Sequence, residues 1–160
     1  MDSRFSPFKV EEGLWFGGAP TTEQDYLYLK EIGITHVIVL QTPEESRLAY
    51  LRPEVSFAIC SSLGMVETRL PIRDLNPKDL RAKIKEYVPL LVDLRARGVS
   101  CFVHCAYGIN RSPTLVAAYL ALTRGLSPEE ACALVEQISP LSQPDLEAVR
   151  LAILERPRSG

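Results

Sequence analysis

Apolar and polar positions along the chain fall into blocks that predict strands and helices in turn. Residues 14–16 form a short apolar run that ends at a pair of glycines, which is typical of a first strand. Residues 36–40 are rich in β-branched side chains without alternation, which predicts a strand covered on both faces. Two further strands are expected at residues 68–72 and 99–103.

Helical patterns lie between these strands. Thr21 or Thr22 can cap a helix that ends at Gly33, and Pro43 favours a short helix over residues 43–51. An amphipathic helix is expected over residues 78–97, with a kink or break at Pro89. Residues 53–64 give no clear prediction.

In the C-terminal third of the chain, the sequence pattern predicts only helices. The first of them ends at Gly125, which is a favourable C-cap residue. Ser127-Pro128-Glu129-Glu130 has the form of a capping box with proline at the first helical position. A last helix opens near residues 142–145 by the same logic and runs to about Glu155.

This order of elements predicts an α/β fold with a mostly parallel central sheet flanked by helices on both sides. The chain has 160 residues and shows no repeat, low-complexity tract or internal linker. We therefore expect a single domain over residues 1–160 with a core at about 13–155. Only the first several residues and the Arg-Pro-Arg-Ser-Gly tail are expected to fray.

Composition narrows the class of protein further. Hydrophobic residues make up 46% and charged residues 24%, as in ordinary soluble proteins. A formal net charge of −2 gives no general attraction to nucleic acid or to anionic membranes. The first residues lack the apolar core of a signal peptide, and the four cysteines do not suggest a disulfide framework. We expect a cytoplasmic monomer without nucleic-acid or membrane partners.

The strongest chemical signal is the stretch of residues 99–121, which predicts a strand, a tight loop and a helix. The loop begins at Cys105 and ends at Arg111. A loop at a helix N-terminus can direct backbone N–H groups at one small anion. We expect this anion to be a phosphate group that Cys105 attacks. The expected phosphate-binding residues are Ala106, Tyr107, Gly108, Ile109, Asn110 and Arg111.

The residue types in and beside this loop suit a thiolate that attacks a phosphate group. Loop amides, the helix dipole and Arg111 all favour the thiolate of Cys105, which is the nucleophilic form of a cysteine. Gly108 allows the backbone to curl, and the planar guanidinium of Arg111 suits two phosphate oxygens. Ser112 places a hydroxyl near the sulfur, where it can stabilise a departing thiolate. His104 is expected to face away from the substrate and to support the loop.

Residues 104–112 have the pattern His-Cys-x-x-Gly-x-x-Arg-Ser, which resembles the signature of the cysteine-dependent protein tyrosine phosphatases. The continuation Arg-Ser-Pro-Thr-Leu-Val-Ala-Ala-Tyr-Leu is similar to their small dual-specificity branch, and the likeness extends over about residues 13–155. This resemblance implies phosphorylated protein or peptide substrates, with phosphotyrosine or phosphoserine/threonine, and a cysteinyl-phosphate intermediate. No metal and no cofactor is expected, because Arg111 and the loop dipoles take the place of a cation.

The resemblance also implies a general acid from a separate loop, an aspartate some thirty residues before the cysteine. Asp74 follows an expected strand at a comparable interval before Cys105. Asp79 is the alternative, but it fits the first turn of the next helix, where a carboxylate complements the helix dipole. Asp74 is therefore the preferred acid and, in the second step, the base.

Other functions remain open at this point. RNA 5′-triphosphatases of the same superfamily also carry asparagine before the arginine, as in Asn110-Arg111, but Ala106 and Tyr107 depart from the residues usual there. Phosphoinositide phosphatases usually carry lysine inside the loop, and this loop has none before Arg111. Outside enzymes, the alternative is a non-catalytic phospho-binding module, although such proteins typically lose the cysteine.

For several other residues a purely structural role is the simpler interpretation. Cys60, Cys101 and Cys132 lie in apolar surroundings and are expected in the core, although a redox role of Cys101 with Cys105 stays open. Tyr107 can either line the rim of the site or pack over the loop. Gln143 is a weak match to a polar residue that orients water in some relatives.

Overall fold

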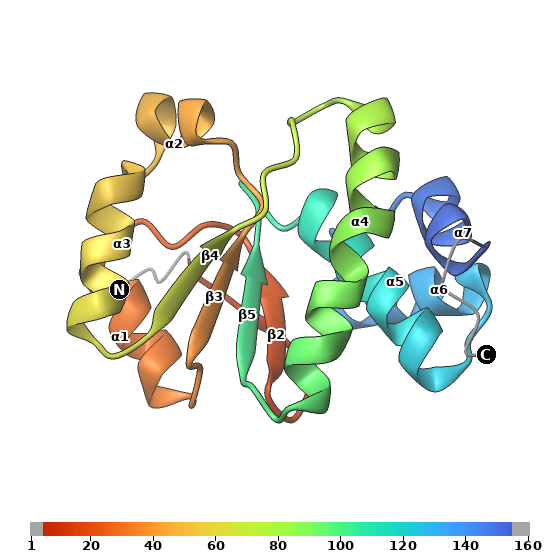
Figure 1. Cartoon of the computed structure of the whole chain (residues 1–160), viewed down its shortest axis with the longest axis horizontal. Coiled ribbons are helices and arrows are strands. Elements are labelled where there is room, and N and C mark those ends of the chain that lie inside the picture. The colour runs from red at the N-terminus through yellow and green to blue at the C-terminus, as the bar shows by residue number, and fades with distance from the viewer. Residues whose placement is uncertain (1–4, 155–160) are drawn as a thin grey trace.

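A mixed sheet with the strand order β1-β2-β5-β3-β4 lies at the centre of the molecule (Figure 1). The structure is a computed structural model that describes residues 5–154. β1 pairs with β2 in antiparallel fashion, and the other neighbouring strands pair in parallel, which confirms the expected mostly parallel sheet. The strands are β1 (Phe8–Glu11), β2 (Leu14–Gly17), β3 (His36–Val39), β4 (Val66–Arg69) and β5 (Cys101–His104).

Helices cover both faces of this sheet, as expected (Figure 1). α1 and α3 pack on one face, and α4 and α5 pack on the other, with α6 and α7 against α5. α2 lies beyond the carboxyl ends of the strands (Figure 1). The helices are α1 (Glu23–Glu31), α2 (Pro43–Ala49), α3 (Pro53–Ser62), α4 (Pro77–Ala96), α5 (Arg111–Arg124), α6 (Pro128–Ile138) and α7 (Leu146–Leu154).

The β-branched run over β3 is buried on both sides, as its lack of alternation predicted. Val37 and Val39 face the cluster formed with α1 and α3. Ile38 and Leu40 face the opposite cluster, which contains α4 and α5. Each such side chain contributes about 1.5–3 kcal/mol when fully buried, so the two clusters fix the strand between two helical layers.

The helix caps follow the sequence signals. Thr22 begins α1 and Ser127 begins α6, each with a complete capping box. Pro43 stands in the first turn of α2, whose N-cap is Thr42. Gly125 ends α5 in the left-handed conformation. None of the helices in the described part of the chain is long and apolar enough to cross a membrane.

The structure adds two elements that were not predicted and moves a third. The strand expected at residues 14–16 is present as β2, but the short strand β1 precedes it and pairs with it. β4 begins two residues earlier than expected, although Leu70 and Ile72 still donate backbone hydrogen bonds to β3 and Leu40. The unassigned residues 53–64 contain α3.

Of the predicted kink or break at Pro89, the break is wrong, because α4 continues through this residue. The kink stays a prediction. Pro89 lies on the exposed side of the helix, while Tyr87, Val88 and Leu91 are buried in the core. This packing keeps the helix continuous despite the missing N–H group. At the C-terminus, Glu155 and the tail that was expected to fray lie outside the described residues, as do residues 1–4 at the N-terminus.

Candidate active site

The predicted phosphate loop connects the central strand β5 to the N-terminus of α5. Cys105 directly follows β5 and is 3% exposed. Its N–H group donates to the carbonyl oxygen of Gly17 at 3.3 Å, which ties the loop to the end of β2. Arg111 is the first residue of α5. The structure therefore brings the thiol and the guanidinium to the same end of the central strand.

Gly108 is required at its position in this loop. Its φ of +73° lies in the left-handed region that favours glycine. A Cβ atom at Gly108 would lie 2.8 Å from the carbonyl carbon of Gly17, which is closer than Cβ atoms come to backbone. Any side chain at this position would push the loop away from β2.

Ser112 lies beside the sulfur, as predicted. Its Oγ is 3.3 Å from Cys105 Sγ, and its backbone N–H group donates to the same sulfur at 3.5 Å. The hydroxyl also donates to the Gly17 carbonyl oxygen at 3.1 Å. Since a serine has one hydroxyl hydrogen, it can serve either the Gly17 carbonyl or a charged sulfur.

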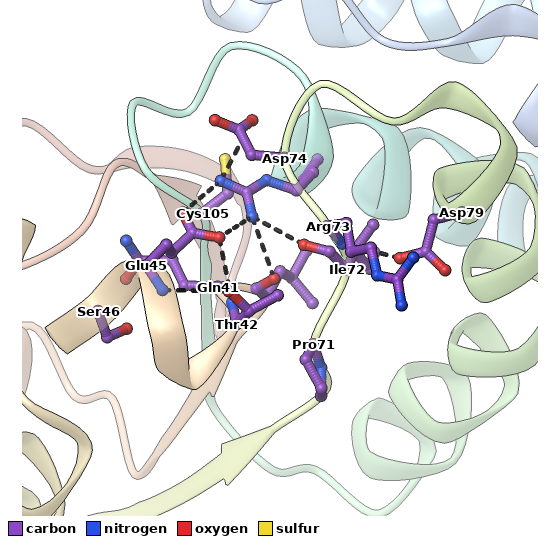
Figure 2. Close-up of polar contacts among 12 residues, drawn as sticks. Gln41, Thr42, Glu45, Ser46, Pro71, Ile72, Arg73, Asp74, Asp79 and Cys105 are labelled. Atoms are coloured by element: carbon purple, nitrogen blue, oxygen red, sulfur yellow. Dashed lines mark hydrogen bonds and ion pairs between the residues drawn. The ribbon is translucent and has the colours of Figure 1, made fainter. Parts of the chain in front are cut away.

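The Arg111 side chain is buried and held by Glu45 of α2. Arg111 Nη1 and Nη2 donate to the two carboxylate oxygens of Glu45 at 2.7 and 2.9 Å. Nη1 also donates to the carbonyl oxygen of Ile72 at 2.9 Å. Burial opposes the ionisation of Glu45, but hydrogen bonds from Arg111 and the Thr42 N–H group hold its pKa below the ordinary value. Figure 2 shows Glu45 among the residues that these polar contacts join.

The structure brings Asp74, rather than Asp79, to this guanidinium. Asp74 Oδ1 lies 3.4 Å from Arg111 Nη2, and the side chain of Asp74 is half exposed. Figure 2 shows Asp79 apart from Asp74 and beside Arg73, whose backbone N–H group donates to it.

Asp79 instead belongs to the first turn of α4, as expected. Its backbone N–H group donates to the N-cap Asn76, and its carboxylate accepts the N–H group of Arg73 at 2.8 Å and the ammonium of Lys83 at 3.0 Å. The hydrogen bond from the Arg73 backbone is the main reason that the pKa of Asp79 is lowered. Asp79 therefore fixes the start of the helix and the preceding loop.

His104 faces away from the thiol, as expected. Its ring stacks on Phe102, with centroids 5.7 Å apart, and its Nδ1 lies 3.1 Å from the Cys105 carbonyl oxygen. Burial disfavours the charged imidazolium and lowers the pKa of His104 to about 4. A neutral His104 therefore supports the loop through its contact with the Cys105 carbonyl oxygen.

Tyr107 and Gln143, the two other residues that the sequence suggested for the site, both lie at the phosphate loop. Tyr107 is 74% exposed and its ring lies 6.5 Å from that of Tyr50, so it lines the rim of the site. Gln143 contacts the loop through its backbone, donating to the Ile109 carbonyl oxygen and accepting from Asn110 Nδ2. A role of its side chain in orienting water stays a prediction.

The other three cysteines are buried, which confirms their expected place in the core. Burial is the main reason that the pKa of Cys60 is raised to about 12, and that the pKa values of Cys101 and Cys132 are raised to about 11. Such thiols are poor sources of thiolate at neutral pH.

Sequence reasoning missed Glu45. It lies in the start signal Thr-Pro-Glu-Glu of α2, where acidic residues are ordinary because they complement the helix dipole. Only the fold shows that this first turn reaches Arg111, which is distant in the sequence.

Known proteins resemble this chain in sequence and in architecture. The family model described as the dual specificity phosphatase catalytic domain matches residues 14–151. Among solved structures, Tk-PTP in its active form superposes with a TM-score of 0.74 over 95% of this chain and 97% of that chain, at 22% identity.

Two curated relatives show the same likeness. The chloroplastic phosphoglucan phosphatase LSF1 of Arabidopsis thaliana is 31% identical over 112 residues, which are 70% of this chain and 19% of that protein. The dual specificity protein phosphatase Mpk3 of Drosophila melanogaster is 28% identical over 140 residues, which are 88% of this chain and 31% of that protein. The chain thus spans less than a third of the length of these relatives. It belongs to the dual specificity phosphatase catalytic domain family.

Proposed function

We propose that this protein is a phosphoprotein phosphatase that hydrolyses phosphomonoesters through a cysteinyl-phosphate intermediate. The observation that carries this proposal is the gathering of three groups around one loop. Cys105 Sγ lies 3.3 Å from Ser112 Oγ, and the buried guanidinium of Arg111 contacts Asp74 from a separate loop. A nucleophile, an anion-binding group and a proton donor are the parts that phosphoryl transfer to a protein side chain needs.

In the first step, the thiolate of Cys105 attacks phosphorus. The sulfur–phosphorus bond forms as the bond from phosphorus to the leaving oxygen breaks. Asp74 donates a proton to that oxygen, so the product leaves as a neutral alcohol or phenol. Arg111 and the N–H groups of residues 106–111 bind the remaining phosphoryl oxygens, whose charge grows in the transition state.

In the second step, water attacks the phosphorus and the sulfur–phosphorus bond breaks. Asp74, now a carboxylate, accepts the proton of the water. The departing thiolate of Cys105 regains negative charge, and the hydroxyl of Ser112 can turn from the Gly17 carbonyl to stabilise it. Inorganic phosphate leaves and the enzyme returns to its starting state.

The alternatives are less well supported. The presence of both Cys105 and Asp74 beside Arg111 argues against a non-catalytic phospho-binding module. A triphosphatase acting on RNA requires attraction to a polyanion, and the net charge of −2 does not provide it. The cytoplasmic location and the monomeric state remain predictions.

Turnover of p-nitrophenyl phosphate by the wild type and Cys105→Ser tests the proposed function. We expect Cys105→Ser to lose all measurable activity, whereas the control Cys132→Ser, at another buried cysteine, keeps it. Rapid acid quenching of the wild type followed by mass spectrometry is expected to find phosphate on Cys105. Full activity of Cys105→Ser would refute the mechanism.

A substrate panel then tests the class of phosphoester. Phosphotyrosine and phosphothreonine peptides are compared with RNA that carries a 5′-triphosphate. We expect hydrolysis of the peptides and little release of phosphate from the RNA. The reverse order would favour the triphosphatase alternative.

A further inference from the structure

Large apolar side chains are exposed in four segments that border the candidate active site. They come from α2, the loop that carries Asp74, the phosphate loop and the connection between α6 and α7. Isolated exposed apolar residues are normal in soluble proteins, but a set around one site marks a contact surface. We call this set the apolar rim, and its members, with their exposed fractions, are Leu48 (87%), Leu75 (92%), Tyr107 (74%), Ile109 (38%) and Leu141 (77%).

Hydrogen bonds, ion pairs and neighbouring positions along the chain tie the segments of the apolar rim to the groups of the candidate site. Tyr107 and Ile109 belong to the phosphate loop itself. Leu75 follows Asp74, whose carboxylate contacts Arg111. Leu48 is one helical turn after Glu45, which holds the same guanidinium.

The segment of Leu141 is fixed to the phosphate loop by two hydrogen bonds. The N–H group of Gln143 donates to the carbonyl oxygen of Ile109, and Asn110 Nδ2 donates to the carbonyl oxygen of Gln143 at 2.9 Å. Leu141 therefore stands at the edge of the loop that would hold the phosphate.

Leu75 carries a second, independent sign of function. Its φ of +56° makes it the one residue other than glycine with positive φ in residues 5–154. A leucine in this conformation costs about 1–2 kcal/mol, and with 92% of its surface exposed no burial offsets this cost. Strain of this kind is typical of positions where a side chain is presented to a ligand.

Charge around the apolar rim argues for a peptide as its occupant. The exposed residues of α2 and the Asp74 loop include Glu44 and Asp74 as well as Arg47 and Arg73, so the two signs balance. An anionic membrane or a polyanion is attracted by a cluster of basic residues, and these segments do not form one. A peptide with apolar side chains needs no such cluster.

We propose that the apolar rim selects phosphopeptides with apolar residues beside the phosphorylated residue. This inference rests on the proposed function, because it assigns a substrate preference to the same site. The flanking side chains of the substrate lie against Leu75 and Leu141, while the phosphoryl group enters the loop between them.

The test compares two phosphopeptides that differ only beside the phosphorylated residue, with leucine and isoleucine in one and serine and asparagine in the other. We expect the wild type to hydrolyse the apolar peptide with at least tenfold higher kcat/KM. In the double variant Leu75→Ser/Leu141→Ser, this ratio is expected to fall below threefold. Phe57→Ser, which changes an exposed apolar residue on α3, is the matched control and is expected to keep the ratio.

Turnover of p-nitrophenyl phosphate separates the two proposals, since this small substrate has no flanking residues. The double variant is expected to hydrolyse it at the wild-type rate. Equal hydrolysis of both peptides by a wild type that is active on p-nitrophenyl phosphate would overturn the role of the apolar rim. The proposed function would be left standing by that result. Faster hydrolysis of phosphatidylinositol phosphate in vesicles than of either peptide would replace the peptide by a lipid.

Discussion

The carboxylate of Glu45 accepts two parallel hydrogen bonds of 2.7 and 2.9 Å from the guanidinium of Arg111. Bidentate pairs of this kind fix the plane of the guanidinium as well as its position. Burial disfavours the charge of Arg111, but Glu45 compensates for it and raises the pKa of the arginine. Glu45 therefore fixes, together with the Ile72 carbonyl, the position of the Arg111 guanidinium.

Substitution Glu45→Gln tests this relationship. The amide keeps one hydrogen bond but removes the charge, which leaves a buried cation and costs about 3–5 kcal/mol of stability. We expect kcat/KM on a phosphopeptide to fall about 10–100-fold, as is typical when a positioned donor is disturbed. The control Glu44→Gln removes a charge from the same helical turn and is expected to leave both quantities nearly unchanged. Equal effects of the two substitutions would contradict the role of Glu45.

Substitutions at Asp74 and Asp79 distinguish the proposed proton donor from a residue that stabilises the first turn of α4. We expect Asp74→Asn to lower kcat on a phosphothreonine peptide about 10²–10⁴-fold, because an alkoxide leaves poorly without a proton. The loss with p-nitrophenyl phosphate is expected to be much smaller, since its leaving group needs little protonation. Asp79→Asn is expected to lower the Tm instead. A larger loss of kcat in Asp79→Asn would reverse the assignment.

His104 predicts how stability depends on pH. Burial lowers its pKa to about 4, so between pH 6.5 and 4 the unfolded chain binds a proton that the folded protein does not. The contribution of neutral His104 to the free energy of unfolding is therefore fully present above about pH 6.5. The free energy of unfolding is expected to fall by about 2 kcal/mol from pH 7 to pH 5. Urea titrations at several pH values measure it. His104→Asn is expected to remove this loss, whereas His36 titrates in both proteins. Identical pH profiles would contradict the prediction.

Pro89 offers a test of α4. Alanine is better than proline in a helix interior by about 3 kcal/mol, so Pro89→Ala is expected to raise the free energy of unfolding by about 1–3 kcal/mol. The matched control is Pro128→Ala, because Pro128 stands in the first turn of α6, where proline is tolerated. Chemical denaturation that shows Pro89→Ala to be less stable than the wild type would contradict this prediction.

Local signals were enough to predict most of the scaffold. The capping boxes at Thr22 and Ser127 and the buried strand β3 are encoded in a few neighbouring residues, so they could be identified directly. The spacing from Cys105 to Arg111 predicted a loop between a strand and a helix for the same reason. β1 has only four residues, and its alternation Phe-Lys-Val-Glu is too short to stand out as a strand.

The residues that complete the candidate site depend on contacts between distant segments. Glu45 and the Ile72 carbonyl reach Arg111 only because β3 lies beside β5 and β4 lies beside β3, so that the segments that follow these strands meet at one edge of the sheet. A capping box with Thr42 distinguishes Glu45 from Glu44, but no local pattern indicates that Glu45 also contacts Arg111. The interval before the cysteine favoured Asp74, but its contact with Arg111 required the folded chain.

The confinement of Arg111 also affects how the protein would meet its substrate. An ordered arginine side chain gives up about 2 kcal/mol of rotamer entropy. Because Glu45 and the Ile72 carbonyl already hold the guanidinium, this entropy is lost when the chain folds and not when a phosphoryl group arrives. The anion then binds to a preorganised cation, and less of its binding energy is consumed in ordering the protein.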